Sequence, residues 1–115
     1  MLKGIYFLET NSSVLSDMEG CFTINDAFVY KGGCGGIREA VKQLGKMQDV
    51  SFIVISDRLI DGTCEEALEQ FSTISAQMIV ATSTRDELMR TRLAKRAKLL
   101  PYPYSYEELD ALLKK

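Results

Sequence analysis

One short apolar run that ends in an aspartate constrains the fold more than any other part of this sequence. Residues 52–56 read FIVIS, the composition of a strand buried on both faces, and Asp57 follows directly. In open α/β sheets, ligands and chemistry lie at the carboxyl edge of the strands. The sequence therefore predicts a site at Asp57, and the rest of the chain decides what that site can do.

Length, composition and charge fit one globular domain. The chain has 115 residues, of which 46% are hydrophobic and 26% charged, so we predict a single domain over residues 1–115. The net charge of −2, from 14 basic and 16 acidic residues, gives no overall field that favours nucleic acid or an anionic membrane. The apolar runs are short and no charged-then-apolar leader opens the sequence, so we expect no membrane insertion and a cytoplasmic location.

The three cysteines, Cys21, Cys34 and Cys64, are widely spaced, and the chain contains no histidine. This pattern argues against a CxxC redox pair and against a zinc site of ordinary spacing. We predict reduced thiols that behave as small hydrophobes or surface residues. The sequence also has no nucleophile elbow, so we predict that the chain is not an independent enzyme and has no cofactor.

The first half of the chain mixes clear and ambiguous segments. Residues 4–8 predict a buried strand, and residues 12–20 a short helix or loop. The apolar runs 21–24 and 27–30 flank Asn25-Asp26, which fits either a hairpin or one strand after a loop, so the first helix is shortened or replaced by a hairpin. Apolar residues at three- and four-residue intervals predict an amphipathic helix over 37–47.

Three helix-start signatures of the form Ser/Thr-x-x-Glu divide the second half of the chain. In each, the hydroxyl can cap a backbone N–H group and the glutamate can return the bond. The apolar runs 52–56, 77–81 and 98–100 precede them, and parallel strands need helical crossovers. We therefore predict an α/β, flavodoxin-like fold, with a doubly wound parallel sheet of about five strands in three α/β/α layers. The signatures begin at Thr63, Thr84 and Ser105 and end at Glu66, Glu87 and Glu108.

A glycine cluster over residues 32–36 precedes the helix predicted for 37–47. A Gly-rich turn that opens a helix can cradle phosphate. No Lys-Ser/Thr follows this one, however, and Arg38 stands where the last glycine of a GxGxxG motif belongs. We predict a flexible turn between strand and helix rather than a nucleotide site.

Several of these segments resemble the receiver domains of two-component response regulators, from about residue 37 to the end of the chain. They are the strand that ends at Asp57, Gly62, the run 78–82 and the closing segment 102–109. The resemblance implies a CheY-like fold in which an aspartate after the third strand accepts a phosphoryl group. It also implies acidic Mg²⁺ ligands after the first strand, a Ser/Thr at the end of the fourth strand and a Lys-Pro pair after the fifth.

The resemblance places Asp57 at the phosphoacceptor position and Glu9 at one of the two acidic positions. These two side chains are therefore the weak candidates for Mg²⁺ ligands, and Mg²⁺ is expected only if the site is active. Leu8 occupies the other acidic position. Phosphoryl transfer needs Mg²⁺ and fixed cations to offset charge on the equatorial oxygens, so the loss of a carboxylate predicts weak metal binding.

The switch positions of receivers map onto Thr82, Tyr102 and Pro103. Ala81 falls at the Ser/Thr position with Thr82 one residue late, and Tyr102 replaces the lysine before Pro103. Without that lysine, the site loses the contact that reads the phosphoryl group. The other interpretation of Asp57 is a strand-end residue whose carboxylate accepts loop N–H groups.

Among degenerate receivers, the chain looks most like the N-terminal atypical receiver domain of TadZ/CpaE proteins, which are pilus-assembly ATPases of the MinD/ParA type. The resemblance rests on residues 32–41, the strand to Asp57 and residues 100–105. In that family the domain precedes the ATPase and is associated with polar placement of the secretion machinery and with self-association. The partners it implies are a second copy, an ATPase domain or the pilus secretion machinery.

The segment 85–98 is the most basic part of the chain and is predicted to be a helix. It is either a solvated face or a docking surface, because in receivers the fourth helix, fifth strand and fifth helix form the output and dimerisation face. Arginine and aromatic residues favour interface centres. The candidate interface residues are Arg90, Arg92, Arg96, Tyr102, Tyr104 and Tyr106.

Two functions remain. The preferred one is a non-catalytic pseudo-receiver that mediates protein–protein interaction or dimerisation, in pilus assembly or polar localisation. The alternative is a phosphotransfer-competent receiver, phosphorylated on Asp57, in which Glu9 and Asp57 hold Mg²⁺ and Thr82 supplies the hydroxyl.

Overall fold

A computed structural model describes residues 2–115, which form a five-stranded sheet with helices on both faces. The strands of this sheet are β1 (Lys3–Leu8), β2 (Phe28–Cys34), β3 (Val50–Ser56), β6 (Gln77–Thr82) and β7 (Lys98–Pro101). The helices are α1 (Ser12–Phe22), α2 (Ile37–Gly45), α3 (Cys64–Gln70), α4 (Glu87–Ala94) and α5 (Tyr106–Leu113). A two-stranded antiparallel hairpin, β4 (Arg58–Leu59) and β5 (Gly62–Thr63), lies between β3 and α3.

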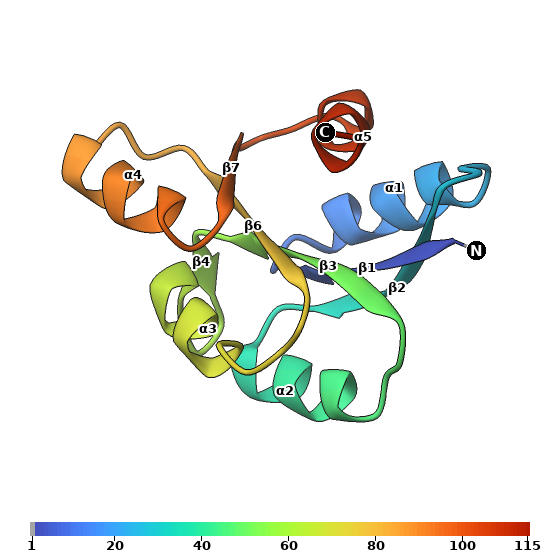
Figure 1. Ribbon diagram of the computed structural model, residues 1–115, viewed down its shortest axis with the longest axis horizontal. Coiled ribbons are helices and arrows are strands. Elements are labelled where there is room, and N and C mark those ends of the chain that lie inside the picture. Colours follow the sequence, from blue (N-terminus) through green and yellow to red (C-terminus); the bar gives the residue numbers. More distant parts are fainter. Residues whose placement is uncertain (1) are drawn as a thin grey trace.

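The sheet has the order β2-β1-β3-β6-β7, and all its neighbouring strands are parallel. Figure 1 shows α1 and α5 on one side of the sheet and α2 and α3 on the other. The predicted doubly wound α/β architecture is therefore confirmed. Within residues 2–115, no helix is both long and apolar enough to cross a membrane.

The continuous apolar runs exist because each central strand is buried on both faces. In β1, Ile5 and Phe7 pack under α1 and α5, whereas Tyr6 and Leu8 pack under α2 and α3. The same alternation recurs in β3, where Phe52 and Val54 face α1 and α5, and Ile53 and Ile55 face α2 and α3. A strand with two covered faces has no polar side, which explains why these segments do not alternate between apolar and polar residues.

The hairpin alternative for the first half of the chain is wrong. Cys21 and Phe22 end α1, which begins after its N-cap Asn11 and is longer than the predicted segment 12–20. Asn25 then turns the chain, because its side-chain oxygen accepts hydrogen bonds from the N–H groups of Ala27 and Phe28. A single strand, β2, follows this loop. The helix is full-length because Met18 and Phe22 reach the core beneath it.

Two of the clustered glycines lie inside β2 and not in a turn. The pairing of β2 with β1 shifts by one residue at Lys31, and Gly32 adopts φ +138° directly after it. Gly33 lies under α1, where a Cβ atom would stand 2.6 Å from Leu15 Cδ2. Gly32 therefore permits the irregular pairing of the edge strand β2, and Gly33 permits the close approach of α1 to β2. Gly35 and Gly36 make the turn into α2.

The helix starts agree with two of the three predicted signatures. Thr63 caps α3 and Ser105 caps α5, the latter with the complete reciprocal bond to Glu108. The third prediction, Thr84, is wrong, because Asp86 caps α4. Consequently α4 covers only residues 87–94 of the predicted 85–98, and Lys98 begins β7. The helix predicted over 37–47 ends at Gly45.

The β4–β5 hairpin was not predicted, and it fixes the loop that follows Asp57. Asp61, in the bend of the hairpin, accepts hydrogen bonds from the N–H groups of Ile37 (2.6 Å) and Arg38 (3.1 Å). These bonds cap α2, whose own N-cap residue Gly36 has no side chain for the purpose. They also hold the pKa of Asp61 below its ordinary value, with a further contribution from the charge of Arg38.

Candidate functional site

The predicted site lies where expected, at the carboxyl edge of the sheet. Glu9 follows β1, Asp57 follows β3, Ser83 follows β6 and Tyr102 follows β7. Since these four strands are adjacent, their ends bring the side chains into one pocket of about 300 Å³. The lining residues are Glu9, Thr10, Ser56, Asp57, Arg58, Ser83 and Tyr102.

Glu9 is a buried carboxylate with both oxygens engaged. Its exposed fraction is 2%. Oε1 accepts a 2.8 Å hydrogen bond from the Ser56 hydroxyl, and Oε2 accepts a 3.0 Å bond from the Asn11 N–H group. A buried carboxylate requires such partners, so these contacts have a structural role. Glu9 joins the end of β1 to the end of β3.

Asp57 is partly exposed and faces the end of β6. Its Oδ2 accepts a 3.1 Å hydrogen bond from the Ser83 N–H group, and its Oδ1 lies 4.0 Å from Cys64 Sγ. The Asp57 carbonyl oxygen accepts a bond from the Cys64 N–H group at the start of α3. Burial, followed by the negative charges of Asp57 and Glu65, raises the pKa of the Cys64 thiol to about 11. Asp57 thus accepts a hydrogen bond from a loop N–H group, as expected for a strand-end residue with a structural role.

Thr82 lies beside the site but does not line the pocket. Ser56 pairs with Ala81, so Thr82 is the next residue of β6, level with Asp57. Its side chain is 2% exposed, and its Oγ1 accepts a hydrogen bond from the Thr84 N–H group at 3.0 Å. The residue at the end of β6 that contacts Asp57 is Ser83, whose backbone N–H group donates a hydrogen bond to the carboxylate. A backbone donor has no sequence signature, so sequence analysis missed it.

Tyr102 follows β7, at the position where the resemblance to receivers expects a lysine. The side chain lines the pocket, and burial together with the charge of Glu9 raises the pKa of the Tyr102 hydroxyl. The Tyr102 N–H group donates to the Thr82 carbonyl oxygen at 3.1 Å, and the Tyr102–Pro103 peptide bond is cis. Arg58, which is exposed and directly follows Asp57, is the cationic residue that lines this pocket.

Two carboxylates, Glu9 and Asp57, line the pocket where the resemblance to receivers expects Mg²⁺ ligands. Each oxygen of Glu9 accepts a hydrogen bond, from Ser56 and from Asn11, and Asp57 is the other carboxylate that lines the pocket. Nowhere in residues 2–115 do three or more His, Cys, Asp or Glu side chains gather closely enough to hold a metal ion. Mg²⁺ is usually bound through one or two carboxylates and several waters, so Asp57, beside a Glu9 held by Ser56 and Asn11, would offer such an ion few protein ligands.

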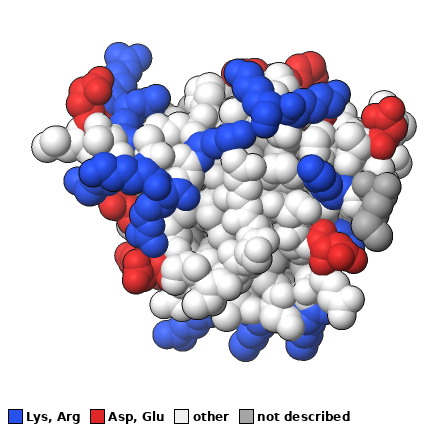
Figure 2. All heavy atoms as spheres, viewed as in Figure 1, with Lys and Arg blue, Asp and Glu red and all other residues white. Residues whose placement is uncertain are grey.

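The arginines predicted as interface residues contact other parts of the chain. Arg92 binds Glu65 of α3 through two 3.2 Å hydrogen bonds, and Arg96 Nη2 lies 3.2 Å from Glu69 Oε2. Arg90 donates to the Thr84 carbonyl oxygen. Figure 2 shows Lys and Arg side chains gathered over α4, at the left of the view. Two arginines of the segment 85–98, Arg92 and Arg96, therefore form ion pairs with glutamates of α3.

The predicted interface tyrosines lie in different surroundings. Tyr106 packs edge-to-face on Phe22, with ring centroids 4.9 Å apart, and its hydroxyl accepts a 2.7 Å bond from Asn25 Nδ2. Tyr104 is half-buried, its hydroxyl oxygen has no partner among residues 2–115, and its ring meets that of Tyr102 edge-on at 6.1 Å. Tyr106 therefore holds α5 against α1, while Tyr102 belongs to the Asp57 pocket.

Comparisons with known proteins find similar structures but no similar sequence family. No family model matches this sequence, and neither does any curated protein. An adenylate cyclase structure from Rhodopirellula baltica has a TM-score of 0.83 at 17% identity, over 99% of this chain and 86% of that one.

Two further structures are similar over nearly their whole length. A DNA-binding response regulator of the LuxR family from Staphylococcus aureus has a TM-score of 0.83 at 13% identity, over 98% of this chain and 97% of that one. The signal receiver domain of an HD domain-containing protein from Pseudomonas fluorescens Pf-5 has a TM-score of 0.83 at 13% identity, over 99% and 93%. Together with the strand order, these likenesses show that the chain has the CheY-like fold of response-regulator receivers.

Proposed function

We propose that this chain is a non-catalytic receiver-like domain that works by binding protein and not by accepting a phosphoryl group. The observation that carries the proposal is the state of Glu9, whose two oxygens are both bound inside the protein. Tyr102 at the lysine position supports it, since a phenol brings no positive charge to a developing phosphoryl group. The pocket has Asp57 and Glu9, but the chain carries Leu8 and Tyr102 where the resemblance places a second acidic residue and a lysine.

The proposal is tested by amide NMR of the domain, titrated with Mg²⁺ and then with beryllofluoride, a phosphoryl mimic. We expect no change at Glu9, Asp57 or Ser83 in the native chain. The matched variant is Tyr102→Lys, which adds the missing cation, and Asp57→Asn is its negative control. Beryllofluoride-dependent shifts in the native chain that Asp57→Asn abolishes would overturn the proposal.

The alternative, a phosphotransfer-competent receiver, is favoured by one arrangement. Asp57 is partly exposed, it receives the Ser83 N–H group, and Arg58 places a positive charge at the same pocket. Phosphorylation of Asp57 would then depend on Arg58 in place of a lysine. The variant Arg58→Gln separates the two functions, because it removes any phosphoryl response under the alternative and changes nothing under the preferred proposal.

The resemblance to TadZ/CpaE proteins supplies a class of partner for the preferred function. It supports binding to a second copy, to a MinD/ParA-type ATPase domain or to pilus secretion machinery, and a cytoplasmic location in which those partners are met. Co-purification of this chain with such an ATPase domain, compared with an unrelated receiver domain as the control, tests that part of the proposal.

A further inference from the structure

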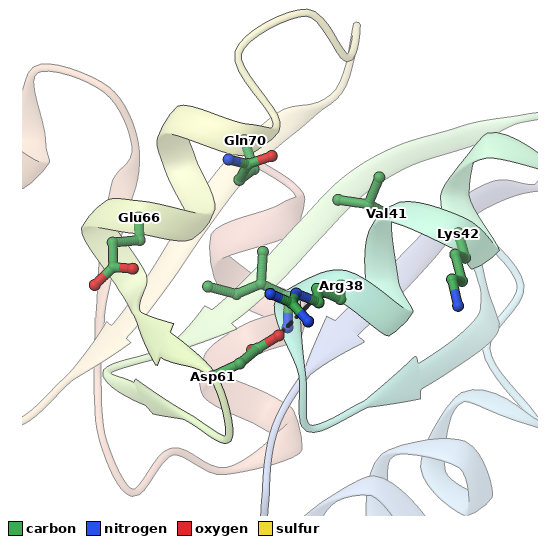
Figure 3. Close-up of a pocket in the computed structure, with 7 residues that line it drawn as sticks. Arg38, Val41, Lys42, Asp61, Glu66 and Gln70 are labelled. Carbon is green, nitrogen blue, oxygen red and sulfur yellow. Dashed lines mark hydrogen bonds between the residues drawn. The ribbon is translucent and has the colours of Figure 1, made fainter.

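A groove of about 410 Å³ lies between α2 and α3, on the other side of the β4–β5 hairpin from the Asp57 pocket. Figure 3 shows its walls: Arg38, Val41 and Lys42 come from α2, and Glu66 and Gln70 come from α3. The side chains of Val41 and Gln70 point toward the space between the helices, while Glu66 points away from Arg38. None of these residues takes part in the Asp57 pocket.

The two walls of the groove carry opposite charge. On α2, Arg38 and Lys42 are one helical turn apart, and neither has an ion-pair partner within residues 2–115. On α3, Glu66 lines the groove, and the helix has no basic residue. Figure 2 shows Lys and Arg side chains along the lower edge of the molecule, where α2 lies in Figure 1. The groove therefore has two basic side chains on its α2 wall, with the Asp61 carboxylate beside Arg38, and one acidic side chain, Glu66, on its α3 wall.

Apolar surface accompanies these charges. Val41 remains 41% exposed although it is in the middle of α2. Ile60, at the tip of the neighbouring hairpin beside Asp61, is 80% exposed. Apolar side chains surrounded by charged ones are the composition of a protein interface, with an apolar centre and a polar rim.

We propose that two copies of this chain associate through this groove about a two-fold axis, so that α2 of each copy lies against α3 of the other. The charge pattern is self-complementary in that arrangement: Arg38 and Lys42 of one copy meet Glu66 of the second, and the reverse contact forms at the same time. The Asp61 and Glu66 carboxylates in the same groove would repel a phosphate backbone, which favours protein over nucleic acid. The inference rests on the proposed protein-binding function and names its partner.

The first test is sedimentation equilibrium of the native chain up to about 1 mM, the concentration at which even a weak pair is populated. We expect a reversible monomer–dimer equilibrium. A purely monomeric chain over this range overturns the dimer but leaves the non-catalytic function with another partner. A beryllofluoride response would overturn that function and leave the sedimentation result unaffected.

Charge reversal locates the contact. We expect R38E/K42E, which makes both walls acidic, and E66K/Q70K, which makes both walls basic, each to raise the dissociation constant roughly tenfold or more. All four side chains are exposed, so the fold should survive, and the far-UV circular dichroism of each variant checks this. Unchanged self-association of both variants overturns the proposal.

The decisive measurement mixes the two variants. In a mixed pair, the acidic α2 of R38E/K42E faces the basic α3 of E66K/Q70K, and the other contact keeps the native basic α2 against the native acidic α3. We therefore expect an equimolar mixture to form more dimer than either variant forms alone at the same total concentration. The matched control is R85E/K95E, which carries the same charge change near α4, outside the groove. If the mixture stays monomeric, or if R85E/K95E pairs with E66K/Q70K equally well, the groove is not the interface.

Discussion

The Ser56 hydroxyl donates a 2.8 Å hydrogen bond to the buried carboxylate of Glu9, across the adjacent ends of β3 and β1. In a working receiver, an acidic side chain at this position is needed for the metal ion. Here the carboxylate accepts hydrogen bonds from Ser56 and from the Asn11 N–H group, so it links the ends of β1 and β3. The sequence position of Glu9 suggests a metal ligand, whereas its hydrogen bonds show a role in the packing of the strand ends.

Removal of this donor should lower stability. We expect Ser56→Ala to reduce the free energy of unfolding by about 1–3 kcal/mol, because Glu9 Oε1 is left buried without its partner. Urea denaturation measures the change. Ser51→Ala is the control, since Ser51 lies in the same strand and its hydroxyl makes no hydrogen bond within residues 2–115. We expect the control to change stability by less than about 0.5 kcal/mol, and equal effects of the two variants would contradict the assigned role of Ser56.

The fold was predictable because its signals are local. The apolar run before Asp57 and the Ser105 capping box each specify one element from a few neighbouring residues, and both are confirmed. The α4 start was not predictable from the same rule. Thr84 and Asp86 are both competent caps, and in the structure Thr84 Oγ1 accepts the Asp86 N–H group while Asp86 caps the helix.

The site was predictable in position but not in chemistry. The carboxyl edge and Asp57 follow from the strand pattern. Whether Glu9 is free or bound depends on Ser56, which is 47 residues away. The Ser83 contact comes from a backbone N–H group, and the Asp61 contacts join a hairpin to a helix start. These interactions depend on tertiary packing, so no pattern of neighbouring residues predicts them.

Asp61 should make stability depend on pH at the acid end. Its pKa is lowered by the N–H groups of Ile37 and Arg38, so the folded state holds the proton less tightly than the unfolded chain does. The stabilisation is therefore present above the ordinary aspartate value of 3.8 and is lost as pH falls through the lower folded value. Thermal melts between pH 7 and pH 2 should show Asp61→Asn less stable than the native chain at neutral pH, with the gap closing in acid.

A surface aspartate provides the control for that experiment. Asp17 lies exposed on α1, and its side chain accepts no hydrogen bond within residues 2–115. We expect Asp17→Asn to follow the native stability at every pH. A pH-independent gap for Asp61→Asn would mean that the carboxylate charge contributes nothing beyond the acceptor that asparagine retains.

The cysteines should differ in reactivity. The Cys64 side chain is completely buried, and burial with the nearby Asp57 raises its thiol pKa to about 11. The thiolate is the nucleophile, so Cys64 should resist alkylation by iodoacetamide at pH 8 until the protein unfolds. Cys21 is half-buried beside a surface pocket and should react before Cys64. Peptide mass spectrometry over a time course distinguishes the two sites, and early modification of Cys64 in folded protein would contradict its placement.

Two glycine substitutions should change stability in opposite directions. In Gly33→Ala, the new Cβ would lie 2.6 Å from Leu15 Cδ2 and 2.8 Å from the Phe7 carbonyl oxygen. Leu15 can turn its side chain away, but the Phe7 carbonyl belongs to the backbone of the paired strand, so β2 would have to move relative to β1, and we expect a loss of about 1–3 kcal/mol in unfolding free energy. Gly20, inside α1, has nothing within 4 Å of the corresponding position. Gly20→Ala should therefore gain about 0.5–1 kcal/mol from helix propensity. Urea denaturation of both variants tests the pair, and a neutral Gly33→Ala would show that β2 does not lie this close to the Phe7 carbonyl group of β1.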